Sequence, residues 1–125
     1  MKLVNVPNAA LEAVGSHPNR PATATLHDSA DLRLVVFRLA AGQSVPVHRS
    51  GSTVMLTAIS GRGFVRGGEE EQLVTAGETV VFEPNEFHGM RAAACELVLL
   101  AAITPRPGER SANRAEANAV TAEAS

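Results

Sequence analysis

Two histidines each follow a glycine and a short apolar run, and both could act as metal ligands or as proton carriers. His48 comes six positions after Gly42, and His88 comes eleven positions after Gly77. Neutral imidazole is a common ligand of transition metals, and near pH 7 it also accepts and donates protons. The residue types therefore indicate either a metal site or a binding pocket built around two imidazoles.

The two stretches that carry these histidines, residues 42–61 and 77–88, resemble the motifs of the cupin family. The family's first motif reads G-x5-H-x-H-x3-4-E-x6-G, and its second reads G-x5-P-x-G-x2-H-x3-N. This chain keeps the glycines and one histidine of each motif. At the other motif positions this chain has Ser50 in place of the second His and Val54 in place of the Glu. It has Glu83 and Asn85 in place of the Pro and Gly of the second motif, and Ala92 in place of its Asn.

The resemblance also implies what this pocket is missing. Cupins typically hold a metal with three His and one Glu, and only His48 and His88 remain at the matching positions. A site with half its ligands binds metal more weakly, so we expect at most one weakly held divalent ion, Fe, Mn, Ni or Zn. Glu83 is the first candidate for a third ligand, and the weaker candidates are Glu86, Cys95, His27 and His17.

Strand alternation extends the pocket beyond the two histidines. Side chains two positions apart on a strand share a face. Under the family's pattern, this rule predicts a mainly apolar pocket formed by His48, Ser50, Val54, Leu56, His88 and Met90. No carboxylate appears at an inward position to orient an imidazole, so acid–base catalysis by histidine alone has no visible partner.

The elements that would position these residues are short strands separated by turns. Strands are predicted at 23–27, 32–39, 44–48, 53–59, 63–66, 72–74, 79–82, 88–92 and 96–102, with a tight turn at Gly67-Gly68. A short helix is predicted over 9–14, with Asn8 as its N-cap and Gly15 after its end. The fold class is therefore all-β, and the resemblance implies a cupin-type double-stranded β-helix, an antiparallel jelly-roll barrel.

Length and composition fit one domain with two flanking segments. The 125 residues divide into an N-terminal helix and arm (1–22), a barrel (23–104) and a tail (105–125) that we expect to be disordered, because its only bulky apolar residue is Val120. Cys95 is the only cysteine, which excludes an internal disulfide and favours a cytoplasmic location. We expect Cys95 to be buried in its strand.

Charge and aromatic content argue against nucleic-acid and membrane partners. The net charge is −2, and the chain has no Trp or Tyr and only four Phe, so it lacks both a basic surface and platforms for base stacking. No segment approaches the roughly 20 apolar residues that span a bilayer, and no signal peptide is expected.

The outward face of the central strand predicts a protein partner. Thr53, Met55, Thr57 and Ile59 face away from the pocket, and a strand that is apolar on both sides is normally covered on both sides. A second subunit would provide this cover in so short a chain, so we expect a homodimer with a two-fold interface.

Two functions remain open. The preferred hypothesis is a small-molecule-binding cupin with a reduced two-His pocket that takes a small organic ligand and holds metal weakly or not at all. The alternative is a metal-dependent cupin enzyme, of dioxygenase or isomerase type, that acts on a small organic acid. A third, weaker hypothesis is a structural barrel in which both histidines are satisfied core residues.

Overall fold

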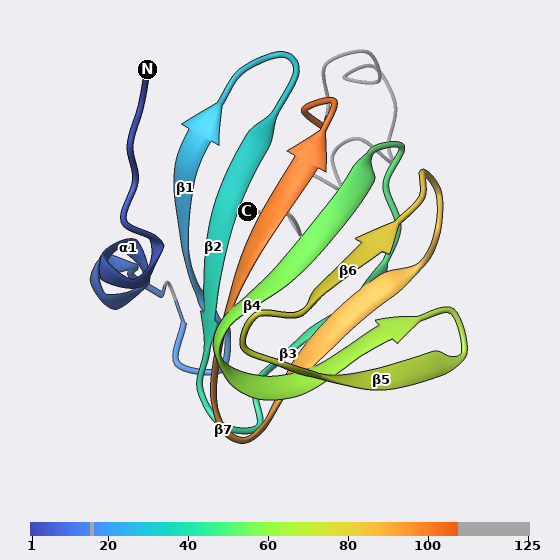
Figure 1. The fold of residues 1–125 in the computed structure, drawn as a ribbon. Coiled ribbons are helices and arrows are strands. Elements are labelled where there is room, and N and C mark those ends of the chain that lie inside the picture. Colours follow the sequence, from blue (N-terminus) through green and yellow to red (C-terminus); the bar gives the residue numbers. More distant parts are fainter. Residues whose placement is uncertain (16, 108–125) are drawn as a thin grey trace.

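The computed structural model describes residues 1–15 and 17–107. Its elements are α1 (Val6–Glu12), β1 (Ala22–Asp28), β2 (Arg33–Leu39), β3 (Ser44–His48), β4 (Thr53–Gly67), β5 (Glu70–Thr75), β6 (Thr79–Phe82) and β7 (His88–Thr104) (Figure 1). All pairings between these strands are antiparallel, which confirms the predicted all-β barrel with a short N-terminal helix. No helix in the described part of the chain is long and apolar enough to cross a membrane.

The long strands β4 and β7 pair along most of their length and belong to two sheets. The C-terminal half of β7 pairs with β2 and its N-terminal half pairs with β3. In the same way β4 pairs with β6 over residues 54–57 and with β5 over residues 62–67. One sheet therefore runs β1-β2-β7-β4-β6, and the other runs β3-β7-β4-β5.

Glycines let each long strand bend without ending. The sequence predicted two strands in place of β4 and two in place of β7, whereas bulges near Gly61 and Gly63 keep each strand continuous. Gly61 has φ +76°, and a Cβ there would collide with the carbonyl group of Glu96. These positions therefore tolerate only glycine, because the backbones of β4 and β7 approach too closely for a side chain.

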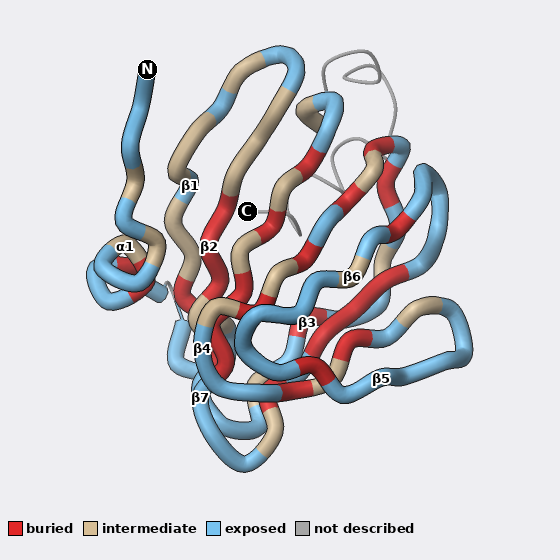
Figure 2. The backbone as a smooth tube through the Cα atoms, in the orientation of Figure 1, coloured by how far each residue is buried: buried red, intermediate tan, exposed pale blue. Residues whose placement is uncertain are grey.

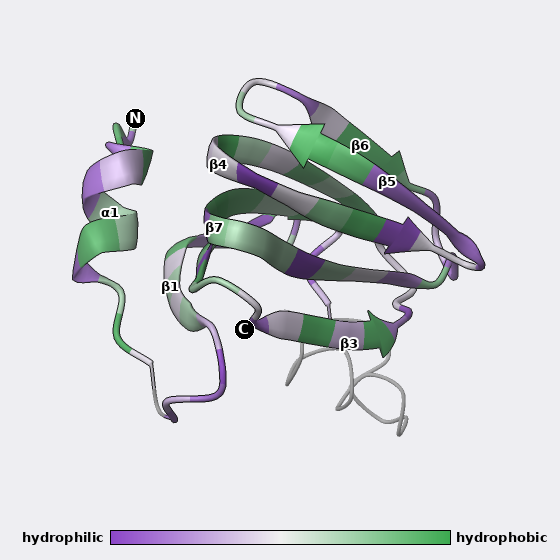
Figure 3. Ribbon diagram, turned by 90° about the horizontal axis from the view of Figure 1, so that it is seen from below, coloured by the Kyte–Doolittle hydropathy of each residue, from purple (hydrophilic) through white to green (hydrophobic). Residues whose placement is uncertain are grey.

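The main core lies between the two sheets. Alternate residues are buried over residues 54–58 of β4 and 97–103 of β7 apart from Val98, whereas Val35, Val36 and Phe37 of β2 are buried in succession (Figure 2). The largest fully buried side chains of the main core are Leu39, Leu97, Leu99 and Val35. Figure 3 shows the same pattern as bands of hydrophobic and hydrophilic residues that alternate along β4 and β7.

A second, smaller cluster lies under α1, on the outer face of the first sheet. Ala10 of the helix packs there with Val36 and Val98. Arg38 fixes the end of the helix, since its Nε donates to the carbonyl oxygen of Ala10 (2.8 Å) and its Nη2 to that of Ala13 (2.9 Å). The helix thus covers one part of this sheet face.

The predicted start of this helix was wrong by three residues. Asn5 is the N-cap, and its side chain accepts a hydrogen bond from the backbone N–H of Asn8 (2.9 Å). The helix begins at Val6 because Pro7 is tolerated in the first turn, where the missing N–H is not needed. It ends at Glu12, so Ala13 and not Gly15 closes it.

Cys95 is exposed, contrary to the prediction. The register shift between β4 and β7 leaves residues 93–96 without a partner in β4, so this part of β7 bulges away from the core. The tail predicted over 105–125 lies outside the described residues from 108 onward. Pro105 and Arg106 contact the barrel: the carbonyl oxygen of Pro105 accepts from Ser52 Oγ (2.6 Å), and Arg106 pairs with Asp28 (2.9 Å).

Candidate functional site

The two motif histidines lie opposite one another on neighbouring strands. His48 at the end of β3 pairs with His88 at the start of β7. Val45 is buried, so strict alternation would turn His48 outward. A β-bulge between Val45 and His48 corrects the register and brings His48 to the same face as His88.

Backbone carbonyl groups hold both imidazoles in the same tautomer. Nδ1 of His48 donates to the carbonyl oxygen of Pro46 (2.9 Å), and Nδ1 of His88 donates to that of Glu86 (3.1 Å). A carbonyl oxygen can only accept, so the neutral form of each ring carries its proton on Nδ1 and its lone pair on Nε2. The ring centroids are 4.3 Å apart, with the planes inclined at 65°.

His88 is uncharged at neutral pH. Burial lowers the pKa of His88 to about 4, because the charged imidazolium would lose its water, and nearby His48 lowers the pKa further. The hydrogen bond to the carbonyl group of Glu86 opposes this shift without overcoming it. His88 is therefore a neutral hydrogen-bond acceptor and not a cation.

A small, mainly apolar cavity adjoins both rings. Its lining consists of Phe37, His48, Ser50, Val54, Leu56, His88, Gly89, Met90, Ala101 and Ile103. The space open to the centres of water molecules is about 20 Å³, and a single water needs roughly 10–15 Å³ by this measure. In this conformation the cavity has room for one or two waters.

All six residues predicted for the pocket line this one cavity, and their role in binding stays a prediction. Sequence reasoning missed four others: Phe37 from β2, Gly89, and Ala101 and Ile103 from the far half of β7. Alternation along β2 and β7 places Phe37 and Ile103 on the inner face. No local pattern shows that these strands pass beside the histidines, because this depends on long-range pairing.

The residues present do not fit a tightly held metal. In residues 1–15 and 17–107, no three or more His, Cys, Asp and Glu side chains come together in a group that could hold an ion. Val54 offers no donor atom, and the hydroxyl group of Ser50 is bonded within its own turn, where it accepts from the N–H of Ser52 (3.1 Å).

The candidate replacement ligands are placed elsewhere. Glu83 and Glu86 belong to the exposed turn before β7, where the Glu86 carboxylate accepts from the backbone N–H of Glu83 (2.8 Å). Cys95 lies at the β7 bulge, and His17 lies in the exposed loop before β1.

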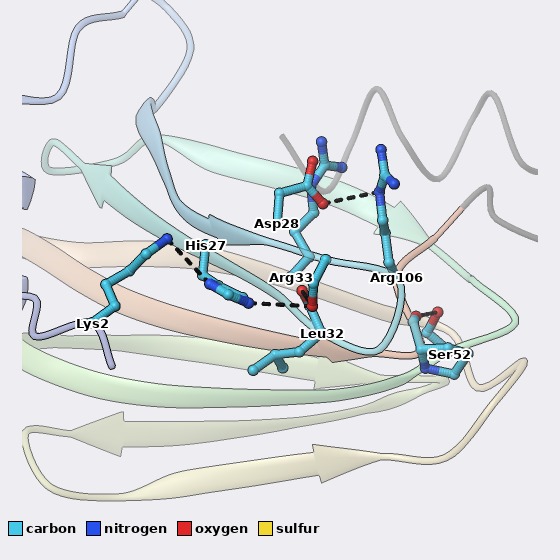
Figure 4. A network of polar contacts seen from close by, with 9 residues as sticks. Lys2, His27, Asp28, Leu32, Arg33, Ser52 and Arg106 are labelled. Carbon is cyan, nitrogen blue, oxygen red and sulfur yellow. Dashed lines mark hydrogen bonds and ion pairs between the residues drawn. The ribbon is translucent and has the colours of Figure 1, made fainter.

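His27 occupies a different setting, in a polar network at the β1–β2 turn (Figure 4). Its Nδ1 accepts from Lys2 Nζ (3.1 Å), so its Nε2 carries the proton and donates to Ser29 Oγ (3.2 Å). Asp28 beside it pairs with Arg33 (3.8 Å) and Arg106 (2.9 Å). His27 thus has the opposite tautomer to the pocket histidines and belongs to a network that ties the N-terminal arm to the barrel.

Comparison with known proteins supports one family. The sequence profile described as "Cupin domain" matches residues 35–103, more than half of the chain. No curated protein matches this chain.

Solved structures match over most of the chain. The protein TT1209 from Thermus thermophilus is 28% identical, with a TM-score of 0.75, over 86% of this chain and 100% of that one. An RmlC-like cupin from Desulfovibrio desulfuricans is 29% identical, with a TM-score of 0.71, over 84% of this chain and 97% of that one. The DMSP lyase DddQ from Ruegeria pomeroyi is 18% identical, with a TM-score of 0.64, over 73% of this chain and 50% of that one, and this likeness concerns the fold alone.

Proposed function

Because this chain belongs to the cupin family, we propose that it is a small-molecule-binding cupin whose two-His pocket takes a small organic ligand and holds metal weakly or not at all. The observation that carries this proposal is the pairing of His48 with His88 beside an apolar cavity, with both Nδ1 atoms bonded to backbone carbonyl groups. Family membership alone does not decide the function, because one fold hosts many chemistries.

The pocket chemistry favours a ligand with an apolar body and a hydrogen-bond donor. Neutral His88, protonated on Nδ1, offers a lone pair at Nε2, which accepts from a hydroxyl, amide or amine group. Most of the remaining lining, including Val54, Leu56 and Ile103, is aliphatic and would contact hydrocarbon. Such a site selects by shape and by one or two hydrogen bonds.

A metal-dependent enzyme is the alternative, and one observation favours it. Histidine ligands of metals commonly donate their second ring N–H to a carbonyl or carboxylate group, as His48 and His88 do here. A bound divalent ion would supply Lewis acidity or redox chemistry. The missing third and fourth ligands weigh against it.

Metal content decides between these two functions. We would measure Fe, Mn, Ni and Zn by elemental analysis on protein prepared without chelator, for the wild type and for the His48→Ala, His88→Ala double variant. The proposal expects only trace metal in both proteins. Near-stoichiometric metal in the wild type that disappears in the variant would overturn it and favour the enzyme.

We also propose a homodimer formed through the outer face of the first sheet. Support comes from two adjacent rows of the pairing register: Leu34, Ala102, Met55 and Val81, and then Leu100, Thr57 and Thr79 beside Val36, which α1 already covers. None of these eight residues is charged, and Met55 and Val81 are 38% and 53% exposed. Depletion of charge is typical of the core of a protein interface.

A cytoplasmic location remains part of the proposal. Its support is the single cysteine, Cys95, which leaves no possibility of an internal disulfide.

A further inference from the structure

The space beside the two imidazoles is too small for an organic ligand, and a larger space lies close by. The inner cavity offers about 20 Å³ to the centres of water molecules. A groove lined by β4, β5 and β6 offers about 220 Å³ by the same measure. Phe82 lines this groove and also contacts His88.

We propose that the ligand of the pocket enters through the groove between β5 and β6, and that Phe82 is the gate between this groove and His88. The ligand is a neutral or cationic molecule with an apolar body. This inference rests on the proposed binding function, and it adds the route, the gating residue and the charge class of the ligand.

The ring of Phe82 is the barrier in the closed arrangement. Its centroid lies 5.1 Å from that of His88, and the two planes are inclined at only 31°, so the phenyl ring covers one face of the imidazole. Phe82 is the last residue of β6, opposite Val54 of β4, and it is 3% exposed. A rotation of this one side chain would uncover His88 toward the groove.

Gly67 provides the space into which the closed ring fits. It pairs with His88 across β4 and β7, and a Cβ at this position would lie 3.1 Å from Cε1 of Phe82. Its φ is outside the left-handed region, so the backbone conformation does not require glycine. Glycine is favoured here because the phenyl ring packs directly against it. A single methyl group added at this position would therefore displace the ring.

The groove chemistry sets the charge of the ligand. Val65, Val80 and Phe82 give it apolar walls. Of the Asp, Glu, Lys and Arg residues that the structure describes, Glu70 and Glu86 line the groove and none lines the inner cavity. An anion would meet these carboxylates, and neither Lys nor Arg among the described residues lines the route to offset them, so this route disfavours a small organic acid.

Three probe molecules and three variants test whether Phe82 gates the pocket and whether the pocket excludes anions. Phenol supplies an apolar ring with a hydroxyl donor, toluene lacks the donor, and benzoate carries a negative charge. Affinities and histidine ring resonances would be measured by NMR titration at pH 7 for the wild type, Phe82→Ala and Gly67→Ala. Leu73→Ala is the control, because Leu73 of β5 is 51% exposed and lines neither space.

Phenol should bind the wild type and shift the ring signals of both His48 and His88. If the closed state holds about nine-tenths of the population, Phe82→Ala should bind phenol about tenfold more tightly, because closure no longer competes with binding. Gly67→Ala should show a smaller increase, since the added methyl group displaces the closed ring. Leu73→Ala should match the wild type, and benzoate should bind every protein at least tenfold more weakly than phenol.

Two results would contradict the inference in different ways. Histidine shifts on phenol binding with equal affinities in all four proteins would overturn the role of Phe82 and leave the binding function standing. No histidine shift with any probe in any protein would overturn the binding function itself. Gly67→Ala keeps the test open should Phe82→Ala fail to fold.

Discussion

Leu99 and Leu100 are neighbours in β7, yet they lie on opposite faces of one sheet, and those faces differ in kind. Leu99 is fully buried in the core between the sheets, in the same cluster as Val54, Leu56 and Met90 of the pocket. Leu100 is half-buried on the outer face, in a row with Val36 and Thr57. The inner face is closed by the fold itself, whereas the outer face is closed only where α1 covers Val36 and Val98. One face thus serves the pocket, and the other is suited to a partner.

The largest expected effect comes from shortening the inner leucine. Leu99→Ala should lower the free energy of unfolding by about 2–5 kcal/mol, because it leaves a cavity in a packed core. Leu100→Ala is the matched control and should cost well under half as much in the monomer. Urea denaturation followed by circular dichroism at low protein concentration measures both. Equal losses would show that the outer face is as closed as the inner one.

The pocket should also make stability depend on pH. The folded pKa of His88, about 4, lies below its ordinary value of 6.5, so above pH 6.5 both folded and unfolded states carry the neutral ring and stability is complete. Between pH 6.5 and 4 only the unfolded state takes up the proton, so stability falls as pH falls, by up to about 3 kcal/mol.

The comparison protein for this pH effect is His88→Phe, which has no imidazole at this position. Subtracting its unfolding free energy from that of the wild type at each pH removes the contribution of carboxylates that titrate in the same range. A difference that stays flat from pH 7 to pH 4 would mean that His88 is accessible to water in the folded protein.

The outer face should respond to charge more than to size. Met55→Glu puts a carboxylate in the middle of the uncharged rows, and desolvating it in a dimer should raise the dissociation constant at least about tenfold, or about 1.4 kcal/mol. Leu73→Glu makes the same kind of change at an exposed leucine of the other sheet and should leave the dimer intact. Analytical ultracentrifugation reports both. A monomeric wild type at every concentration would refute the dimer.

Much of this contrast could be predicted from the sequence, because alternation is local. The rule that residues two apart share a strand face placed His88 with Met90, and Val54 with Leu56, and all four line the cavity. The cupin motifs provided the fold class. What alternation could not show is where a strand carries a bulge: it is a bulge that turns His48 inward and another that exposes Cys95.

Long-range pairing accounts for the rest of what the sequence did not reveal. Phe37 and Ile103 reach the pocket because β2 and the far half of β7 pass beside it. The size of the cavity and the contact of Phe82 with His88 depend on packing between strands that are distant in the sequence. The start of α1 was a local question, and it was predicted wrongly because two asparagines precede the helical run.

Those two asparagines give the smallest and most local test of the outer face, part of which α1 covers. Asn5→Ala should cost about 1 kcal/mol, because the Asn5 side chain accepts from the N–H of Asn8 and no other group of the cap replaces it when it is removed. Asn8→Ala changes a residue inside the helix whose backbone N–H, and not its side chain, makes this bond, so its effect should stay within about 0.5 kcal/mol. Thermal unfolding of both variants measures which of them is less stable.

Because Ala10 of the helix packs on Val36 and Val98, fraying of α1 should also raise the hydrogen exchange of β2 and β7 near these residues in Asn5→Ala alone. A larger loss of stability in Asn8→Ala than in Asn5→Ala would show that Asn8 caps the helix and that the cap at Asn5 does not hold α1 on this face.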